Sequence, residues 1–408
     1  MASLSASNGS FTVDLLKKLD ESYSGKNIFF SSWSISSALA MTYVGAKGNT
    51  ATQMAEVLHF KKTTGTGDCL QVTRTSRGRP KKRKMDPDNC KDEDIHSAFQ
   101  ALISLINKPQ TSYLLKTANR LYEEQTLPFR REFVEFVQKY YHAEPQAVDF
   151  IKAAEQVRKE INSWAESQTE GKIQNLLPKG AVHANTVLVL VNAIYFKGKW
   201  KKRFLNENTS EHLFRLSKTK TKLVQMMHLQ DTFSTCYLEP MKVKIVELPY
   251  VNDDLSMLIL LPDDIEDKST GLEQLERELT YENVSKWTSP EMMMMSEVEL
   301  SLPRIKLEES YNLKSTLSSM GMKDAFSPGQ ANFTGMSEHD DLYLSQVFHK
   351  SFVEVNEEGT EAAAATGAVI VVRSSANPVQ FKADHPFLFF IRHNTTMSIL
   401  FFGRFCSP

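Results

Sequence analysis

The chain has 408 residues, of which 41% are hydrophobic, and its 48 basic and 49 acidic residues give a formal net charge of −1. This composition is enough for a substantial buried core, and no run of about 18 apolar residues predicts a membrane span. The sequence also lacks the H-E-x-x-H, G-x-S-x-G and G-x-x-x-x-G-K-[ST] motifs, so we expect neither the hydrolase nor the nucleotide-binding chemistry that depends on them.

The first residues, M-A-S-L-S-A-S-N-G-S, contain no basic segment followed by an apolar block, and we therefore expect no cleaved secretory signal. Four cysteines in a chain of this length do not form a disulfide framework. Cys236 and Cys406 lie in strand-like surroundings and are expected to be buried thiols. Cys69 and Cys90 flank a polar insert that they could close on oxidation, and neither has a neighbour at zinc-ligand spacing.

The polar insert spans residues 61–94, between a helical pattern that ends near 57–60 and another that resumes near 95–105. Its glycines, prolines and charges, with few apolar residues, are typical of a mobile loop. Residues 71–85 carry seven basic side chains and no acidic one. The other 41 basic and 49 acidic residues of the chain leave a net charge of −8, so a basic arm is predicted on an acidic body.

The centre of this arm, Arg77-Gly78-Arg79-Pro80, looks like an AT-hook. Glycine lets the backbone lie deep in the narrow minor groove of A·T-rich DNA, and proline holds the path extended. The two arginines can then follow the groove floor, where the negative potential is strongest. The residues that follow favour salt-sensitive phosphate contacts and also match a nuclear localisation signal: Lys81, Lys82, Arg83 and Lys84. The alternative is a solvated basic loop without a specific partner.

Further along the chain, residues 186–191 and 193–196 are apolar on both sides of Asn192, which predicts a buried strand. Residues 357–375 read E-E-G-T-E-A-A-A-A-T-G-A-V-I-V-V-R-S-S. Because side chains alternate on a strand, one face of this segment would be uncharged and free of proline, with Glu361 on the other face. The inward residues would be Thr360, Ala362, Ala364, Thr366, Ala368, Ile370 and Val372. The segment is also compatible with an alanine-rich helix followed by an ordinary strand.

Five motifs resemble the signatures of the serpin family and occur in the family's order: residues 27–37, 191–200, 347–366, 384–391 and 401–408. The chain resembles the ovalbumin-type intracellular (clade B) branch. The resemblance implies one domain over 1–408 with an α+β fold, in which a helical half, three β-sheets and an exposed reactive centre loop at 357–380 are expected. One departure is Ser32, where the family usually has proline.

The resemblance also implies the site residues. The reactive bond would be Arg373–Ser374, with Val371 and Val372 as specificity residues, although a bond one residue earlier is also compatible. A sheet-opening cluster would contain Ser31, Ser34, Asn192 and His349, with Trp200 where the loop enters the sheet. The hinge would contain Glu358, Gly359, Thr360, Glu361, Ala362, Ala363, Ala364 and Ala365.

By this resemblance the protein is a protease inhibitor rather than an enzyme, and it needs neither a cofactor nor a metal. An AT-hook in this loop is similar to that of a heterochromatin-associated nuclear serpin. That similarity implies nuclear localisation, chromatin condensation, self-association on chromatin and inhibition of papain-like cysteine proteases of the cathepsin L type. Two alternatives remain: inhibition of trypsin-like serine proteases, which Arg373 suits, and a non-inhibitory architectural role on chromatin.

Overall fold

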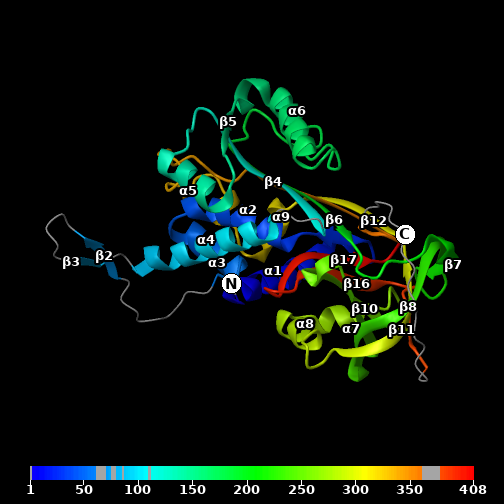
Figure 1. Cartoon of the computed structure of the whole chain (residues 1–408). Coiled ribbons are helices and arrows are strands. Elements are labelled where there is room, and N and C mark those ends of the chain that lie inside the picture. Colours follow the sequence, from blue (N-terminus) through cyan, green and yellow to red (C-terminus); the bar gives the residue numbers. More distant parts are fainter. Residues whose placement is uncertain (1, 61–69, 75–79, 85–86, 109–111, 361–376) are drawn as a thin grey trace.

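The structure is a computed structural model that describes residues 2–60, 70–74, 80–84, 87–108, 112–360 and 377–408. Helices from the N-terminal half and from the middle of the chain surround two large sheets (Figure 1). The helices are α1 Ala2–Tyr23, α2 Ser32–Gly45, α3 Gly48–Val57, α4 Pro87–Ile106, α5 Arg131–Tyr141, α6 Phe150–Gln168, α7 Glu273–Glu278, α8 Tyr281–Trp287 and α9 Lys314–Met320.

One large sheet has six strands in the order β12-β13-β14-β6-β4-β5. The central strand β6 is buried along almost its whole length, as its apolar sequence predicts. Most neighbours are antiparallel, but β13 pairs with β6 in parallel, and so does β4 with β5. The strands are β4 Tyr113–Glu124, β5 Gln146–Val148, β6 Leu188–Lys199, β12 Ile305–Asn312, β13 Gln346–Asn356 and β14 Gly359–Thr360.

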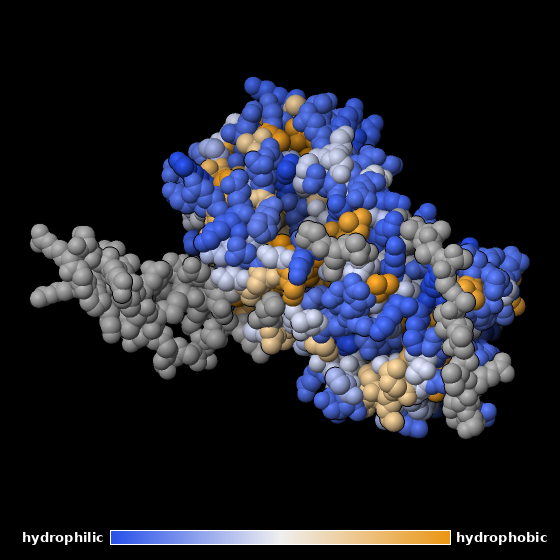
Figure 2. All heavy atoms as spheres, in the orientation of Figure 1, coloured by the Kyte–Doolittle hydropathy of each residue, from blue (hydrophilic) through white to orange (hydrophobic). Residues whose placement is uncertain are grey.

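Both faces of this sheet are covered. On one face, Val157, Ile161 and Ala165 of α6 pack against alternate residues of β6 and β13, such as Val191 and Phe348. The other face belongs to the main core, where α2 lies beneath β6 and β4. The outer side of α6 is mostly hydrophilic, and the apolar residues visible elsewhere are scattered in small patches (Figure 2), which is normal for a protein surface.

The second large sheet has nine strands, with β7 paired to β8 beside the main order β1-β17-β16-β10-β9-β8-β11-β15. Its strands β10, β16 and β17 are buried throughout and form the centre of the core. The strands are β1 Ile28–Phe30, β7 Thr209–Arg215, β8 Thr221–Leu238, β9 Val243–Pro249, β10 Leu255–Pro262, β11 Met294–Pro303, β15 Val379–Lys382, β16 Phe387–His393 and β17 Ser398–Phe405. The expectation of an α+β fold with several sheets is confirmed.

The third sheet is an antiparallel pair, β2 Leu70–Arg74 and β3 Pro80–Lys84, inside the range expected to be a loop. Helix α4 also begins at Pro87, eight residues before the predicted resumption. Pro at the first helical position and acidic residues in the first turns both favour a helix start there. The prediction of a loop over all of residues 61–94 is therefore wrong for the β2–β3 pair and for the first part of α4.

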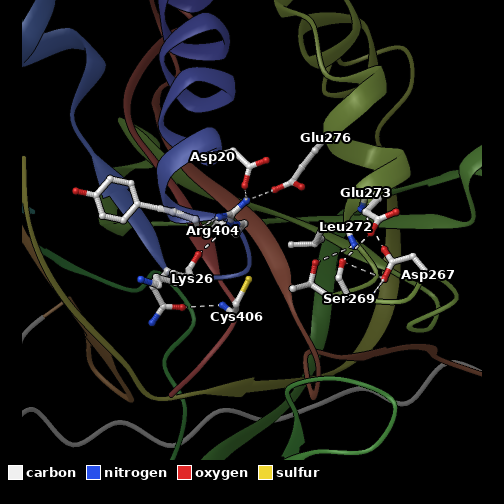
Figure 3. Close-up of polar contacts among 12 residues, drawn as sticks. Asp20, Lys26, Asp267, Ser269, Leu272, Glu273, Glu276, Arg404 and Cys406 are labelled. Atoms are coloured by element: carbon white, nitrogen blue, oxygen red, sulfur yellow. Dashed lines mark hydrogen bonds and ion pairs between the residues drawn. The ribbon is translucent and has the colours of Figure 1, made fainter. Parts of the chain in front are cut away.

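A buried arginine fixes the last strand to the first helix. Arg404 of β17 is 1% exposed and contacts Asp20 of α1 at 2.5 Å and Glu276 of α7 at 2.8 Å (Figure 3). It also donates to the carbonyls of Tyr23 and Lys26. Because an isolated buried charge is costly, this set of acceptors is needed to keep a guanidinium at that position.

The two described cysteine thiols, Cys236 and Cys406, are free and buried, as predicted. Within the described residues, no helix is long and apolar enough to cross a membrane. The same part of the chain holds no group of three His, Cys, Asp or Glu side chains placed to bind a metal ion. Cys69 and the side chain of Cys90 lie outside the described part.

Candidate loop hinge and sheet-opening site

The described end of the predicted hinge, Gly359–Thr360, forms strand β14 between two strands of the six-stranded sheet. Strand β14 is antiparallel to both neighbours, because Thr360 pairs with Val355 of β13 and with Gly198 of β6. Further along, β13 and β6 pair directly with each other, from Gln346 opposite Val189 to Phe352 opposite Tyr195. The sheet is therefore parted by two residues at one end and closed at the other, and we call the closed part the β13–β6 seam.

Gly359 is the residue that allows this close approach. Its φ is +136°, a conformation that residues with a side chain rarely adopt. A Cβ at this position would lie 2.2 Å from the Gly198 carbonyl oxygen and 2.8 Å from Lys199 Cα. Both contacts are with backbone, so no side-chain movement could relieve them.

The start of the loop is anchored by Glu357, which is 4% exposed. Its carboxylate accepts from Arg304 at 2.6 Å and from the Thr209 hydroxyl at 2.6 Å. Burial opposes ionisation, but the hydrogen bonds from Arg304 and Thr209 outweigh it, and the pKa of Glu357 is lowered. Glu357 was expected at the start of the loop, but its partners were not, since Arg304 lies between β11 and β12 and Thr209 begins β7.

Trp200 lies beside the hinge, as expected from the resemblance. Its indole Nε1 donates to the Asn356 carbonyl at 3.0 Å, and its backbone N–H donates to the Glu358 carbonyl at 2.9 Å. The ring stacks on Tyr250 with centroids 4.6 Å apart. Arg203 lies 3.6 Å from the Glu358 carboxylate. Trp200 thus holds the backbone on both sides of Glu357, at Asn356 and at Glu358.

The structure brings the four residues of the predicted sheet-opening cluster together under the β13–β6 seam. His349 Nδ1 lies 2.5 Å from Asn192 Oδ1, directly across the seam. Asn192 Nδ2 donates to the Ser34 hydroxyl at 2.6 Å. The Ser31 backbone N–H donates to His349 Nε2 at 3.2 Å, and the Ser31 hydroxyl accepts from the Ser34 N–H as the N-cap of α2.

These contacts define the state of His349. Because Nε2 accepts from an N–H group, the ring proton is on Nδ1 and is donated to Asn192. Complete burial lowers the pKa of His349 to about 3, so the ring is neutral at physiological pH. The histidine is a buried polar link between strand and helix.

Two further contacts were not predicted. Asn119 of β4 accepts from Asn192 Nδ2, which extends the cluster to the next strand. Ser32, the departure from the family pattern, accepts from the Thr12 hydroxyl at 2.6 Å and so connects α2 to α1. A proline at this position would have no such contact. No spacing in the sequence identifies either pair, since Asn119 and Thr12 lie far from their partners.

Several predicted site residues lie outside the described part of the chain. They are the remaining hinge residues 361–365, the specificity residues Val371 and Val372, and the bond Arg373–Ser374. Arg77, Gly78 and Arg79 of the AT-hook also lie outside it. Pro80, Lys81, Lys82, Arg83 and Lys84 form strand β3.

The comparison with known proteins agrees with this geometry. The family described as Serpin (serine protease inhibitor) matches residues 6–408. Serpin B10 of Homo sapiens is 53% identical over 408 residues, which is 100% of both chains. Uncleaved ovalbumin has a TM-score of 0.85 and 38% identity, and the match covers 100% of both chains. A loop-inserted structure of a cleaved ovalbumin mutant has a TM-score of 0.83 and 37% identity, also with full coverage.

The first prediction concerns the hinge. Gly359→Ala places a methyl group inside the backbone of β6, so β14 should leave its position and the Trp200 and Phe204 amides should lose their acceptors. We expect hydrogen exchange of these two amides to accelerate at least about 10-fold, which corresponds to about 1.4 kcal/mol.

Gly321→Ala is the matched control, because Gly321 has a similar φ of +127° and its Cβ position meets only a Val57 side-chain atom at 3.5 Å. It has comparable backbone strain and lacks the backbone clash. Equal protection of Trp200 and Phe204 in Gly359→Ala and in the wild type would show that the hinge does not depend on this contact.

The second prediction concerns pH. Unfolded histidine has a pKa of about 6.5, whereas that of His349 is about 3 in the fold, so acid stabilises the unfolded state. Between pH 7 and pH 5 this histidine should reduce the free energy of unfolding by about 2 kcal/mol. His349→Gln should remove that part of the pH dependence in urea titrations, whatever its effect at pH 7. An unchanged difference between the two pH values would contradict the assignment.

Proposed function

This chain belongs to the serpin family of protease inhibitors, and we propose that it is a suicide inhibitor that inserts its cleaved loop into the β13–β6 seam. The observation that supports this proposal best is β14. Two residues of the loop already lie between the strands that would have to separate, and they are antiparallel to both.

Continuing the register of β14 indicates where an inserted strand would lie. Position 364 would fall between Ser351 and Ile194, and position 366 between His349 and Asn192. These partners belong to the main-core side of the sheet, which suits the uncharged residues of the inward face. Insertion would therefore break the hydrogen bond between His349 and Asn192 and place Thr366 between them.

The energetic logic follows from the sheet. One parallel ladder between β13 and β6 would be replaced by two antiparallel ladders, which satisfy more backbone groups and are somewhat more stable per residue. The intact loop cannot insert fully because both of its ends are fixed, by Glu357 and by β15. Cleavage frees one end, and the difference in free energy between the closed sheet and the sheet with the inserted loop then drives insertion.

The chemistry belongs to the protease. Its nucleophile attacks the Arg373 carbonyl, forms an acyl bond to Arg373 and expels the amine of Ser374. Insertion before hydrolysis of that bond would carry the protease away from its original position. This chain contributes the substrate bond and the strand, and it needs no cofactor.

We favour papain-like cysteine proteases of the cathepsin L type as targets, because such enzymes select an apolar residue at the position of Val372 and accept arginine next. Trypsin-like serine proteases are the second candidate, because their specificity depends on the arginine itself. The family description names serine proteases.

We also propose that the protein acts in the nucleus on A·T-rich DNA and chromatin, where it promotes condensation, as its resemblance to the heterochromatin-associated serpin MENT implies. The sequence supports this proposal, since Arg77-Gly78-Arg79-Pro80 is followed at once by four basic residues. Lys81, Lys82, Arg83 and Lys84 follow directly on β3.

The third prediction tests insertion. Thr360→Arg puts a charge on the inward face, which should abolish covalent trapping of the protease while the loop is still cut. Glu361→Arg, one residue on and facing outward, introduces the same side chain and should retain trapping. The measurement is the fraction of protease in a denaturant-stable complex. Full trapping by Thr360→Arg would refute loop insertion at this seam.

The fourth prediction separates the two target classes. Val372→Gly should reduce the inhibition rate for cathepsin L by roughly 10–200-fold and leave that for trypsin nearly unchanged. Arg373→Ala should have the opposite selectivity. Second-order rate constants for both proteases and both variants give the answer. If Val372→Gly does not affect cathepsin L, the papain-like preference is wrong.

The fifth prediction concerns DNA. Arg77→Ala with Arg79→Ala should reduce the preference for A·T-rich over G·C-rich duplexes more than it reduces affinity at low salt. Lys81→Gln with Lys82→Gln should weaken both duplexes alike and lower the salt slope by about 2. Gel-shift titrations over a salt series measure both effects. An unchanged A·T preference in the arginine variant excludes an AT-hook.

A further inference from the structure

A cavity of about 250 Å³ lies beside β4 of the six-stranded sheet, and its lining comes from that strand and from the region of α2, α4, α5 and α6. Figure 1 shows these helices around β4. Its volume is below that of a pocket for a drug-sized ligand. It is lined mainly by polar atoms, and residues from all five elements contribute to it. It is separate from the hinge and from the β2–β3 pair.

The cavity is open along the strand itself. Strand β4 pairs with β6 from Tyr113 to Glu123, but on its other side it pairs with β5 only at residues 122–124. Thr117, Asn119 and Arg120 line the cavity where that second side of β4 pairs with no strand of the described chain.

Two hydrogen-bond donors in the lining have no acceptor among the described residues. Trp33 is 2% exposed, and its indole Nε1–H is without a partner. The Nε–H of Arg120 is also buried and unpaired. The Arg120 guanidinium lies over the Trp164 ring, 4.1 Å from its centroid, which fixes its orientation. Buried donors of this kind are rarely left unsatisfied in proteins.

We propose that this cavity binds a small organic anion with several carboxylate or phosphate oxygens. Both unsatisfied groups are donors, so the missing partner must supply acceptors. Arg120 adds a permanent positive charge and a planar group suited to such oxygens. The one carboxylate in the lining, Glu144, is exposed and can remain in solvent.

The anion would act on sheet opening, a consequence that rests on the proposed function. Asn119 joins the cavity lining to Asn192 and, through it, to His349 at the seam. Trp164 belongs to α6, which covers the other face of the strands that must separate. A ligand held by Trp33 of α2 and by Arg120 would tie β4 to both helices and favour the closed sheet.

Binding is tested first and does not depend on inhibition. Citrate, inorganic phosphate and chloride are titrated into the full-length protein at matched ionic strength, with calorimetry and thermal unfolding as readouts. We expect saturable heat with citrate or phosphate and a rise in Tm of roughly 2–4 °C beyond that seen in chloride. Citrate alone indicates a carboxylate ligand, and phosphate alone a phosphate ligand.

The variants Trp33→Phe and Arg120→Gln each remove one unpaired donor and should abolish the saturable heat. Arg131→Gln is the matched control, because Arg131 is an exposed arginine of α5 that pairs only with Glu135. Multivalent anions stabilise proteins generally, and such an effect would be equal in all four proteins. Equal Tm shifts without saturable heat would show that the cavity holds only water and would overturn the proposal.

Coupling is then measured as the rate of protease trapping with and without the bound anion. We expect the anion to slow trapping at least about 5-fold in the wild type and in Arg131→Gln, and not in Arg120→Gln. Saturable binding without any effect on trapping would retain the site and remove its link to sheet opening. If the wild type traps no protease at all, the proposed function fails while the binding result stands.

Discussion

The direct pairing of β13 with β6 is the constraint on which the other features depend. It closes the six-stranded sheet in a parallel arrangement, and beneath it His349 and Asn192 join the two strands through one buried hydrogen bond. Such a bond contributes little while it is made, but a buried donor or acceptor left without a partner costs about 1–3 kcal/mol. The seam can therefore open only if something else supplies hydrogen bonds to both strands. A loop strand with the register of β14 would do so at every position.

The contacts around this seam hold the first loop residues in place and support the two strands from below. Trp200, Glu357 and Gly359 hold the first loop residues between the strands without letting them advance. Ser31 and Ser34 bring the start of α2 to the same point, so movement of the strands also disturbs the helix that supports them. The buried Arg404 is not part of the seam, and its ion pairs join β17 to α1 and α7. The part of the molecule that must move is thus separated from the part that must remain fixed.

Much of this arrangement could be predicted from the sequence, because its signals are local or belong to recognisable motifs. The apolar run around Asn192 predicted the buried strand β6. The motifs placed Ser31, Ser34, Asn192 and His349 in one cluster and Trp200 beside the hinge. The contacts of Glu357 with Arg304 and Thr209 could not be predicted, since three segments far apart in sequence meet there and many other charged residues were equally eligible. The start of α4 was missed because charged and polar residues carry no periodic apolar pattern. The pair β2–β3 was missed for a related reason: a ladder of backbone hydrogen bonds does not require an apolar face.

The anchoring of Glu357 also gives the loop a fixed length. If the carboxylate remains bound to Arg304 and Thr209 while the rest of the loop moves, the pivot is one residue and the moving arm is the chain between it and Arg373. Extended at about 3.3 Å per residue, that arm reaches roughly 50 Å, which exceeds the roughly 40 Å spanned by the 12 residues of β6 beside which it would lie. The chain itself then fixes the length of the moving arm. Under the proposed function, the number of residues between a salt bridge and a peptide bond sets how far a captured enzyme is displaced, independently of which enzyme it is.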